Sequence, residues 1–185
     1  SPALTDIICM VENVSNMFIT GPDVIKTVTG ETVDFEGLGG PSIHGTKSGV
    51  AHLISKTEKE CIGKIKKLLS YLPSNNIDNP PEIIGNDTTK RKNKSLKSIV
   101  PKDSSKPYDV REVINEVLDK GSFFEIMEEY AQNAVTGLAR LNNKVVGLVA
   151  NQPMVLAGCL DINSSDKISR FVRWMDTMNI PLINF

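Results

Sequence analysis

Apolar runs and turn signals alternate along the second half of the chain, and their order predicts strands and helices in a mixed α/β fold. The runs 135–141 and 145–150 flank Asn142-Asn143, a pair that can adopt the positive φ angles of a two-residue hairpin turn. Shorter strands are predicted at 123–127 and 181–185. This succession of hairpin, loop, helix and strand is typical of the beginning of an α/β domain.

Two amphipathic helices accompany these strands. One is predicted to open at Asp109 and Glu112 and to stop at Gly121, and the other to be capped by residues 164–166. Apolar residues at helical spacing form the stripe that each would bury. The stripes are Val110, Val113, Ile114, Val117 and Leu118 in the first helix, and Ile168, Phe171, Val172, Met175 and Met178 in the second.

The first half carries weaker signals. Residues 7–11 form a short apolar run that suits a strand buried on both faces, and the run 17–19 predicts a strand leading into a helix over 22–29. Gly21-Pro22 would begin that helix and Gly30 would end it. A capping box at Ser55 and Glu58 predicts a further helix. Its expected buried stripe is Ile62, Ile65, Leu68, Leu69 and Leu72, with Lys59, Lys64, Lys66 and Lys67 on a solvated face.

Residues 73–107 differ in composition from both flanks. Polar residues, prolines and the basic run 90–94 dominate there, and little apolar surface is available to offset the entropy of ordering. We therefore predict an interdomain linker with one anchored patch at 96–100. It separates a first part, 1–72, from a second part, 108–185.

Composition limits the possible partners. The chain has 185 residues and a net charge of −1, and it holds 40% hydrophobic residues, enough for a core. This balance favours neither nucleic acid nor an anionic membrane as a partner, and no apolar run reaches the length of a membrane span. Cys9, Cys61 and Cys159 are far apart and lack metal-ligand spacing, so buried, reduced thiols and no metal site are expected.

Candidate chemistry lies in two places. Glycines are dense between residues 37 and 49, which indicates either tight surface turns or a wall of backbone amides facing a ligand. His44 and His52 lack a partner at triad or metal spacing, so we expect histidines that orient loops. Asn151-Gln152-Pro153 follows an apolar strand and is either a polar turn or a ligand-binding edge.

The order of several motifs indicates a family. The chain contains MFITGPDVIKTVTGE, then YLPSNN and KPYDVREVI, and finally VGLVANQPMVLAGCLDINSSDKISRFVRWMDTMNIPLINF. In this order and spacing they resemble the carboxyltransferase (β) subunits of biotin-dependent acyl-CoA carboxylases. The nearest members are the propionyl-CoA carboxylase β chain and methylmalonyl-CoA carboxyltransferase. The resemblance spans essentially all 185 residues.

The resemblance implies a crotonase (ClpP)-like fold, with the end of one such domain at 1–72 and the start of a second at 108–185. The first would bind the acyl-CoA and the second carboxybiotin, which a biotin carrier and biotin carboxylase subunit supply. The full-length protein would be a homohexamer, a dimer of trimers, in the cytoplasm of a bacterium or archaeon or in the mitochondrial matrix. Expected substrate-binding residues are Gly21, Pro22, Gly39, Gly40, His44, Asn151, Gln152, Pro153 and Gly158.

The resemblance implies chemistry that takes no general base from the protein, because the biotin freed by loss of CO2 takes the α-proton of the thioester. Backbone amides would stabilise the enolates of the thioester and of biotin. The segments with those amides would lie outside this chain, so no catalytic residue is assigned. We expect an internal fragment that is inactive alone. The main expectation is carboxyl transfer to a short acyl-CoA, propionyl-CoA first. A methylmalonyl-CoA decarboxylase or transcarboxylase subunit, a non-catalytic CoA-binding assembly module of the same fold, and a crotonase-type hydratase or hydrolase are the alternatives.

Overall fold

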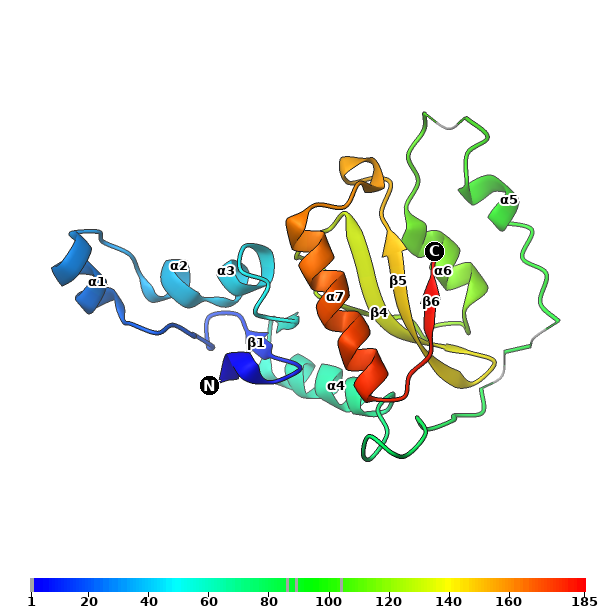
Figure 1. Ribbon diagram of the computed structural model, residues 1–185, viewed down its shortest axis with the longest axis horizontal. Coiled ribbons are helices and arrows are strands. Elements are labelled where there is room, and N and C mark those ends of the chain that lie inside the picture. The colour runs from blue at the N-terminus through cyan, green and yellow to red at the C-terminus, as the bar shows by residue number, and fades with distance from the viewer. Residues whose placement is uncertain (1, 86, 89, 104) are drawn as a thin grey trace. The chain divides into compact units, whose positions relative to one another are not determined.

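The computed structural model describes residues 2–85, 87–88, 90–103 and 105–185 (Figure 1). The chain divides into two compact units, Ser1–Lys66 and Lys67–Phe185, and the boundary falls within helix α4 (Glu58–Leu69). The sequence places the end of the first part a few residues later, at 72. The assignment of 1–72, 73–107 and 108–185 to family domains stays a prediction.

The second unit is built on one sheet. Its strands are β3 (Phe124–Ile126), β4 (Ala134–Leu141), β5 (Lys144–Asn151) and β6 (Leu182–Asn184), in that spatial order. The first two pairings are antiparallel, and β6 pairs parallel with β5. Asn142 and Asn143 have φ angles of 51° and 71°, which confirms the predicted hairpin turn.

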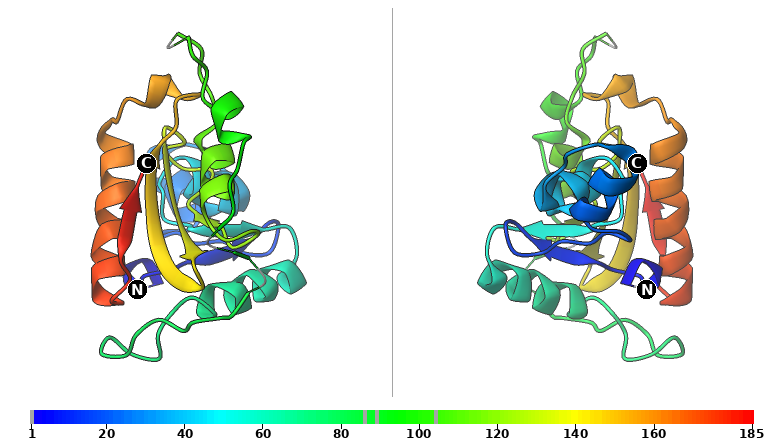
Figure 2. Two further views of the ribbon diagram at one scale, coloured as in Figure 1. Left: turned by 90° about the vertical axis from the view of Figure 1, so that its right-hand side faces the viewer. Right: turned by 90° about the vertical axis from the view of Figure 1, so that its left-hand side faces the viewer.

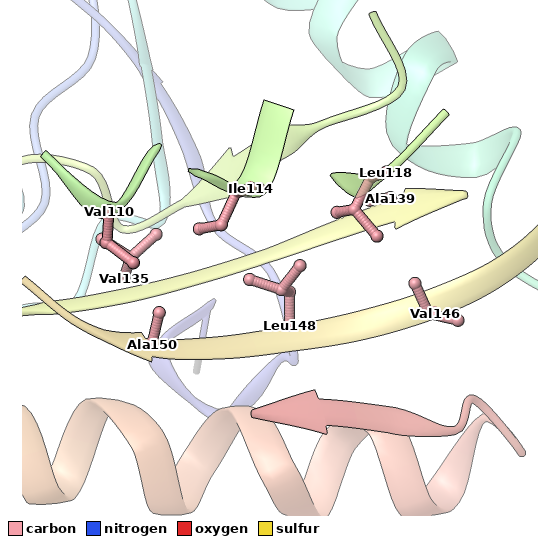
Figure 3. Packing of buried hydrophobic residues seen from close by; sticks show 8 residues of the cluster. All are labelled: Val110, Ile114, Leu118, Val135, Ala139, Val146, Leu148 and Ala150. Atoms are coloured by element: carbon pink, nitrogen blue, oxygen red, sulfur yellow. The ribbon is translucent and has the colours of Figure 1, made fainter. Parts of the chain in front are cut away.

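A helix covers each face of this sheet. Helix α6 (Val110–Val117) lies on one face and α7 (Ile162–Thr177) on the other (Figure 2). Apolar residues of α6 meet the facing residues of β4 and β5, as the close view shows (Figure 3). These residues are Val110, Ile114, Leu118, Val135, Ala139, Val146, Leu148 and Ala150, and all are buried. The periodicity of α6 therefore predicted its buried face well, although Val117 is exposed. The predicted stop at Gly121 is wrong, because the helix ends at Val117 with Leu118 as its C-cap.

Helix α7 begins earlier than the sequence predicts. Asp161 is its N-cap, and Asp161 and Ser164 form a reciprocal capping box, so residues 164–166 lie inside the helix. Its buried face consists of Ser164, Lys167, Phe171, Trp174 and Met175. The expected stripe contains Phe171 and Met175 but misses Lys167 and Trp174. The predicted buried face is therefore rotated about the helix axis relative to the observed one.

Among the described residues between α4 and α6 there is one short helix, α5 (Leu96–Ile99), at the predicted anchored patch. Arg140 of β4 ties this stretch to the sheet, since its guanidinium donates to the carbonyls of Ser70 and Pro81, each at 2.7 Å. The same guanidinium carbon lies 4.9 Å from the centre of the Tyr71 ring. Part of the predicted linker is therefore bonded to the second unit.

The first unit contains less regular structure. Strands β1 (Cys9–Val11) and β2 (Leu53–Ser55) pair parallel, and a 3₁₀ turn, η1 (Pro2–Leu4), precedes them. Three helices lie between the strands: α1 (Pro22–Thr29), α2 (Phe35–Gly39) and α3 (Pro41–Thr46). The bounds of α1 match the prediction, and Gly30 ends it with a φ of 77°. The predicted strand at 17–19 is wrong, because this stretch is irregular.

The prediction for α4 needs two corrections. The cap is Thr57, whose Oγ1 accepts from the amide of Glu60, while a Glu60 carboxylate oxygen accepts from the amide of Lys56. Of the predicted stripe only Leu68 is buried, since Ile62, Ile65 and Leu69 are exposed. Leu72 is partly buried and lies beyond the end of the helix. Lys64, placed on the solvated face, instead donates from Nζ to the carbonyl of Ile54 at 2.5 Å.

These two capping schemes predict different effects of mutation. Thr57→Ala is expected to lower the free energy of unfolding by about 1 kcal/mol, because it removes an N-cap. Ser55→Ala is expected not to lower it, since the Ser55 hydroxyl is buried without a hydrogen-bond partner among the described residues. Urea unfolding of both variants measures the difference. A larger loss in Ser55→Ala would instead support the capping box read from the sequence.

Candidate functional site

In the first unit, two of the predicted site residues, Gly39 and His44, contact the backbone of Met17. The amide of Met17 donates to the carbonyl of Gly39 at 2.9 Å, and a Cβ added at Gly39 would lie 2.2 Å from the Met17 oxygen. His44 Nε2 donates to the same Met17 carbonyl at 2.5 Å, and its Nδ1 lies 2.8 Å from the Ser48 hydroxyl. His44 therefore orients a loop through hydrogen bonds, as expected.

The remaining predicted residues of this unit flank that contact. Gly40 follows Gly39 and is the N-cap of α3, and a Cβ there would lie 2.7 Å from the carbonyl oxygen of Glu36. Gly21 is the N-cap of α1 with Pro22 at the first helical position, and a Cβ at Gly21 would lie 3.8 Å from the Phe18 ring. No described residue of α1 is buried. Gly39 and Gly40 thus allow backbone segments to approach closely, whereas a side chain at Gly21 would make only an ordinary contact.

In the second unit, the predicted residues form one turn beyond the carboxyl end of β5. Asn151 is exposed, and its Nδ2 donates to the carbonyl of Gly158 at 2.7 Å. Gln152 has its side chain turned inward, with only 1% of the residue exposed. The chain then continues into the turn η2 (Leu156–Gly158), which includes Gly158. All three residues of η2 have φ angles between 50° and 76°. Asn151, Gln152, Pro153 and Gly158 therefore belong to one local structure.

An ionic network contacts this turn through Gln152, and no local sequence pattern predicts it. Arg111 donates to both carboxylate oxygens of Glu125 at 2.7 Å. Burial raises the pKa of Glu125, although the hydrogen bonds from Arg111 act in the opposite direction. Asp109 accepts from the Gln152 side chain at 2.7 Å. Asp109 was expected only as a helix cap, because its partner is 43 residues away and leaves no local pattern.

Lys167 is the second group that sequence reasoning missed. It is 1% exposed, and its ammonium donates to the carbonyls of Met127, Tyr130 and Ala134 at 2.7–2.8 Å. Burial lowers its pKa to about 8. A signal was present, since Lys167 lies four positions before Phe171, on the line of apolar residues that the helix buries.

The structure also tests the expectations for thiols, metal sites and membrane-spanning helices. Cys61 is buried and Cys9 half-buried, but Cys159 is exposed, so the expectation of three buried thiols is wrong for Cys159. Across the described ranges, no group of three His, Cys, Asp or Glu side chains could hold a metal ion. Within the same ranges no helix combines the length and the apolar character that a membrane crossing needs.

A cavity of about 390 Å³ lies elsewhere, at the hairpin end of the sheet. It is lined in part by Asp87, Arg91, Asp119 and Asn143. Arg91 pairs with Asp87, and Asp119 accepts from the amides of the hairpin turn at 2.7 and 2.9 Å. Because these polar groups bond to one another and none is a predicted site residue, the cavity is not assigned to the function.

Comparison with known proteins identifies the family. The family described as "Carboxyl transferase domain" matches residues 1–185. A propionyl-CoA carboxylase carboxyltransferase subunit from Haloferax mediterranei is 52% identical over 185 residues, and a methylmalonyl-CoA decarboxylase subunit alpha from Veillonella parvula is 51% identical over 185. Both alignments cover 100% of this chain and 36% of the relative, so the chain spans little more than a third of their length.

A solved structure agrees with the sequence relatives. The transcarboxylase 12S structure with hydrolysed methylmalonyl-coenzyme A superimposes with a TM-score of 0.94 at 47% identity, over 99% of this chain and 36% of that one. The expected crotonase-like α/β fold is thereby confirmed. Full coverage by the family and the close structural agreement lead to one conclusion: this chain belongs to the carboxyl transferase domain family.

Proposed function

We propose that this chain is part of an acyl-CoA carboxyltransferase that moves a carboxyl group between carboxybiotin and a short acyl-CoA, propionyl-CoA first. The observation that carries the proposal is the backbone agreement, at a TM-score of 0.94, with a transcarboxylase whose structure contains hydrolysed methylmalonyl-coenzyme A. The names of both relatives support a short acyl-CoA as substrate. A methylmalonyl-CoA decarboxylase or transcarboxylase subunit is the alternative that the same names favour.

In this proposal the first unit contributes a wall that binds the acyl-CoA, and the second unit contributes a wall that binds carboxybiotin. Gly21, Pro22, Gly39, Gly40 and His44 would form part of the acyl-CoA wall. The close approach at Gly39 supports this role, since it fixes the loop without side chains that would fill the space. The hydrogen bonds of His44 to Met17 and Ser48 would keep that wall in place, so His44 orients the loop and transfers no proton.

The turn after β5 would form part of the carboxybiotin wall through Asn151, Pro153 and Gly158, and the buried Gln152 would support it from inside the protein. Next to exposed Asn151, the turn exposes the apolar side chains of Met154 and Leu156. Such a surface fits a ring system with a polar urea edge and an apolar body. When bound, carboxybiotin on a carrier subunit would supply the carboxyl group. Amides of neighbouring sequence would stabilise the oxyanions, within a homohexamer in the cytoplasm or mitochondrial matrix.

Product analysis of the protein that carries this chain tests the proposal. The protein is incubated with propionyl-CoA, a biotinylated carrier, biotin carboxylase, ATP and bicarbonate, and acyl-CoA products are separated by mass spectrometry. We expect methylmalonyl-CoA, formed only when the carrier is biotinylated. Release of CO2 from methylmalonyl-CoA would support the decarboxylase, and carboxyl transfer to pyruvate the transcarboxylase. Binding of CoA with none of these reactions would contradict the proposal and indicate an assembly module.

A further inference from the structure

The turn beyond β5 is held in a conformation that it would not keep by itself. Leu156 and Ala157 have φ angles of 50° and 51°, and Gly158 follows with 76°. The left-handed region is unfavourable for a residue with a side chain, and two such residues are adjacent here. Strain of this kind persists only where surrounding contacts determine the conformation. Contacts at both ends of the turn hold these residues in place.

Gln152 makes most of the contacts at the start of the turn. Its Nε2 donates to Asp109 Oδ1 at 2.7 Å, and its Oε1 accepts from the amides of Val110 at 3.3 Å and Met154 at 3.4 Å. Its backbone amide donates to the carbonyl of Asn133 at 2.9 Å. The buried carboxamide thus joins the end of β5 to the start of α6, and both its nitrogen and its oxygen bond to the protein.

Asp109 is itself fixed, so the contact with Gln152 has a rigid origin. Its Oδ1 accepts from the amide of Arg111 at 2.9 Å, which caps α6. The Arg111 guanidinium binds Glu125 of β3 through two hydrogen bonds. Because both ends of this chain of contacts lie on regular elements, Gln152 is held more precisely than a loop residue usually is.

The far end of the turn is closed by the neighbouring residue. Asn151 donates from Nδ2 to the carbonyl of Gly158, and the Asn133 side chain donates to the carbonyl of Cys159 at 2.8 Å. With Gln152 fixing the first residues and Asn151 fixing the last, the strained residues between them have little freedom. Removal of the Gln152 anchor would let the turn relax toward ordinary backbone angles.

We propose that Gln152, oriented by Asp109, is the positioning residue for the turn 151–158 in carboxyl transfer, and that it acts without touching the biotin. This inference rests on the proposed function and refines the role of one residue in it. Gln152 fixes the positions of Asn151 and of the exposed apolar side chains of the turn, Met154 and Leu156. Displacing the turn would impair the reaction with carboxybiotin and leave acyl-CoA binding by the first unit unchanged.

An exchange of acid and amide tests the pair. In Gln152→Glu, two carboxylates would face each other, so kcat/KM for the biotin substrate is expected to fall by tenfold to about a hundredfold. KM for acyl-CoA is expected to stay within about twofold. The loss should lessen as the pH falls, because one of the facing carboxyls then takes up a proton. The double variant Asp109→Asn/Gln152→Glu restores a donor and acceptor pair, and its activity is expected to recover.

Gln132→Glu is the matched control, since it makes the same chemical change at an exposed position of the same unit. It is expected to match the parent protein at every pH. Unchanged kinetics in Gln152→Glu, or equal losses toward both substrates without recovery in the double variant, would overturn the inference.

Amide hydrogen exchange separates this inference from the proposed function. Residues 152–158 are expected to exchange faster in Gln152→Glu than in the parent protein, whatever reaction the parent protein carries out. An inactive parent protein with this change in exchange would overturn the proposed function alone. Unchanged exchange would overturn the positioning role.

Discussion

Replacing Lys167 by methionine is expected to lower the free energy of unfolding of the second unit by about 1–3 kcal/mol. Methionine nearly preserves the volume of the side chain, so the loss would come from the polar contacts. The carbonyls of Met127, Tyr130 and Ala134 would lose their common donor. A buried carbonyl left without a donor costs about 1–3 kcal/mol.

The backbone between β3 and β4 explains why a charged group is needed at this position. Met127 and Ala131 have φ angles of 58° and 44°, so this connection turns sharply and directs several carbonyls inward. A single ammonium has three donors and can satisfy them together. Urea unfolding measures the loss, and hydrogen exchange over 127–134 locates it. Lys144→Met is the control, because its side chain is 69% exposed and a change below about 0.5 kcal/mol is expected.

The pH dependence of stability gives a second check on Lys167. Burial lowers the pKa of its ammonium from 10.5 to about 8. Between these values the unfolded chain binds more protons than the folded chain, so the free energy of unfolding is expected to rise with pH over this interval. The Lys167→Met variant should lack this contribution. An equal rise in the variant and the parent protein would show that other groups produce it.

Local signals in the sequence predicted the second unit well. The hairpin at Asn142-Asn143 and helix α6 follow from residues that are neighbours in the chain, because turn chemistry and helical periodicity act over a few positions. The family motifs added the fold, which the comparisons confirm. The hairpin, helix α6 and the family motifs can each be recognised without knowing which residues meet from distant parts of the chain.

Features set by distant contacts could not be predicted. The run 17–19 is no strand because the backbone of Met17 bonds to Gly39 and His44 instead of to another strand. In α4 the periodicity indicated a helix but not which side faces the protein, and Lys64 reaches β2 while Ile62 stays exposed. The candidate site shows the same limit. The turn at 151–158 was recognised, whereas the inward orientation of Gln152 depends on Asp109, far away in sequence.

Replacing Gly39 by alanine is expected to lower the free energy of unfolding of the first unit by about 3 kcal/mol. The added Cβ would lie 2.2 Å from the carbonyl oxygen of Met17, 2.9 Å from its carbonyl carbon and 3.0 Å from the Phe18 ring. The two nearest of these atoms belong to the backbone, so no side-chain rotation can relieve the contact. The loop must move, and the hydrogen bond from the Met17 amide to Gly39 would lengthen or break.

Gly63→Ala is the matched control, since it adds the same methyl group inside α4 with no described atom within 4 Å. It is expected to raise the free energy of unfolding by about 0.5–1 kcal/mol, because alanine favours a helix over glycine. Thermal unfolding of both variants should therefore show shifts of opposite sign. Kinetics then connect the loop to the proposed function: KM for acyl-CoA should rise in Gly39→Ala, while KM for the biotin substrate should stay unchanged. If Gly39→Ala unfolds at the temperature of the parent protein, the close approach to Met17 is not a requirement of the fold, and its place in the acyl-CoA wall loses its physical support.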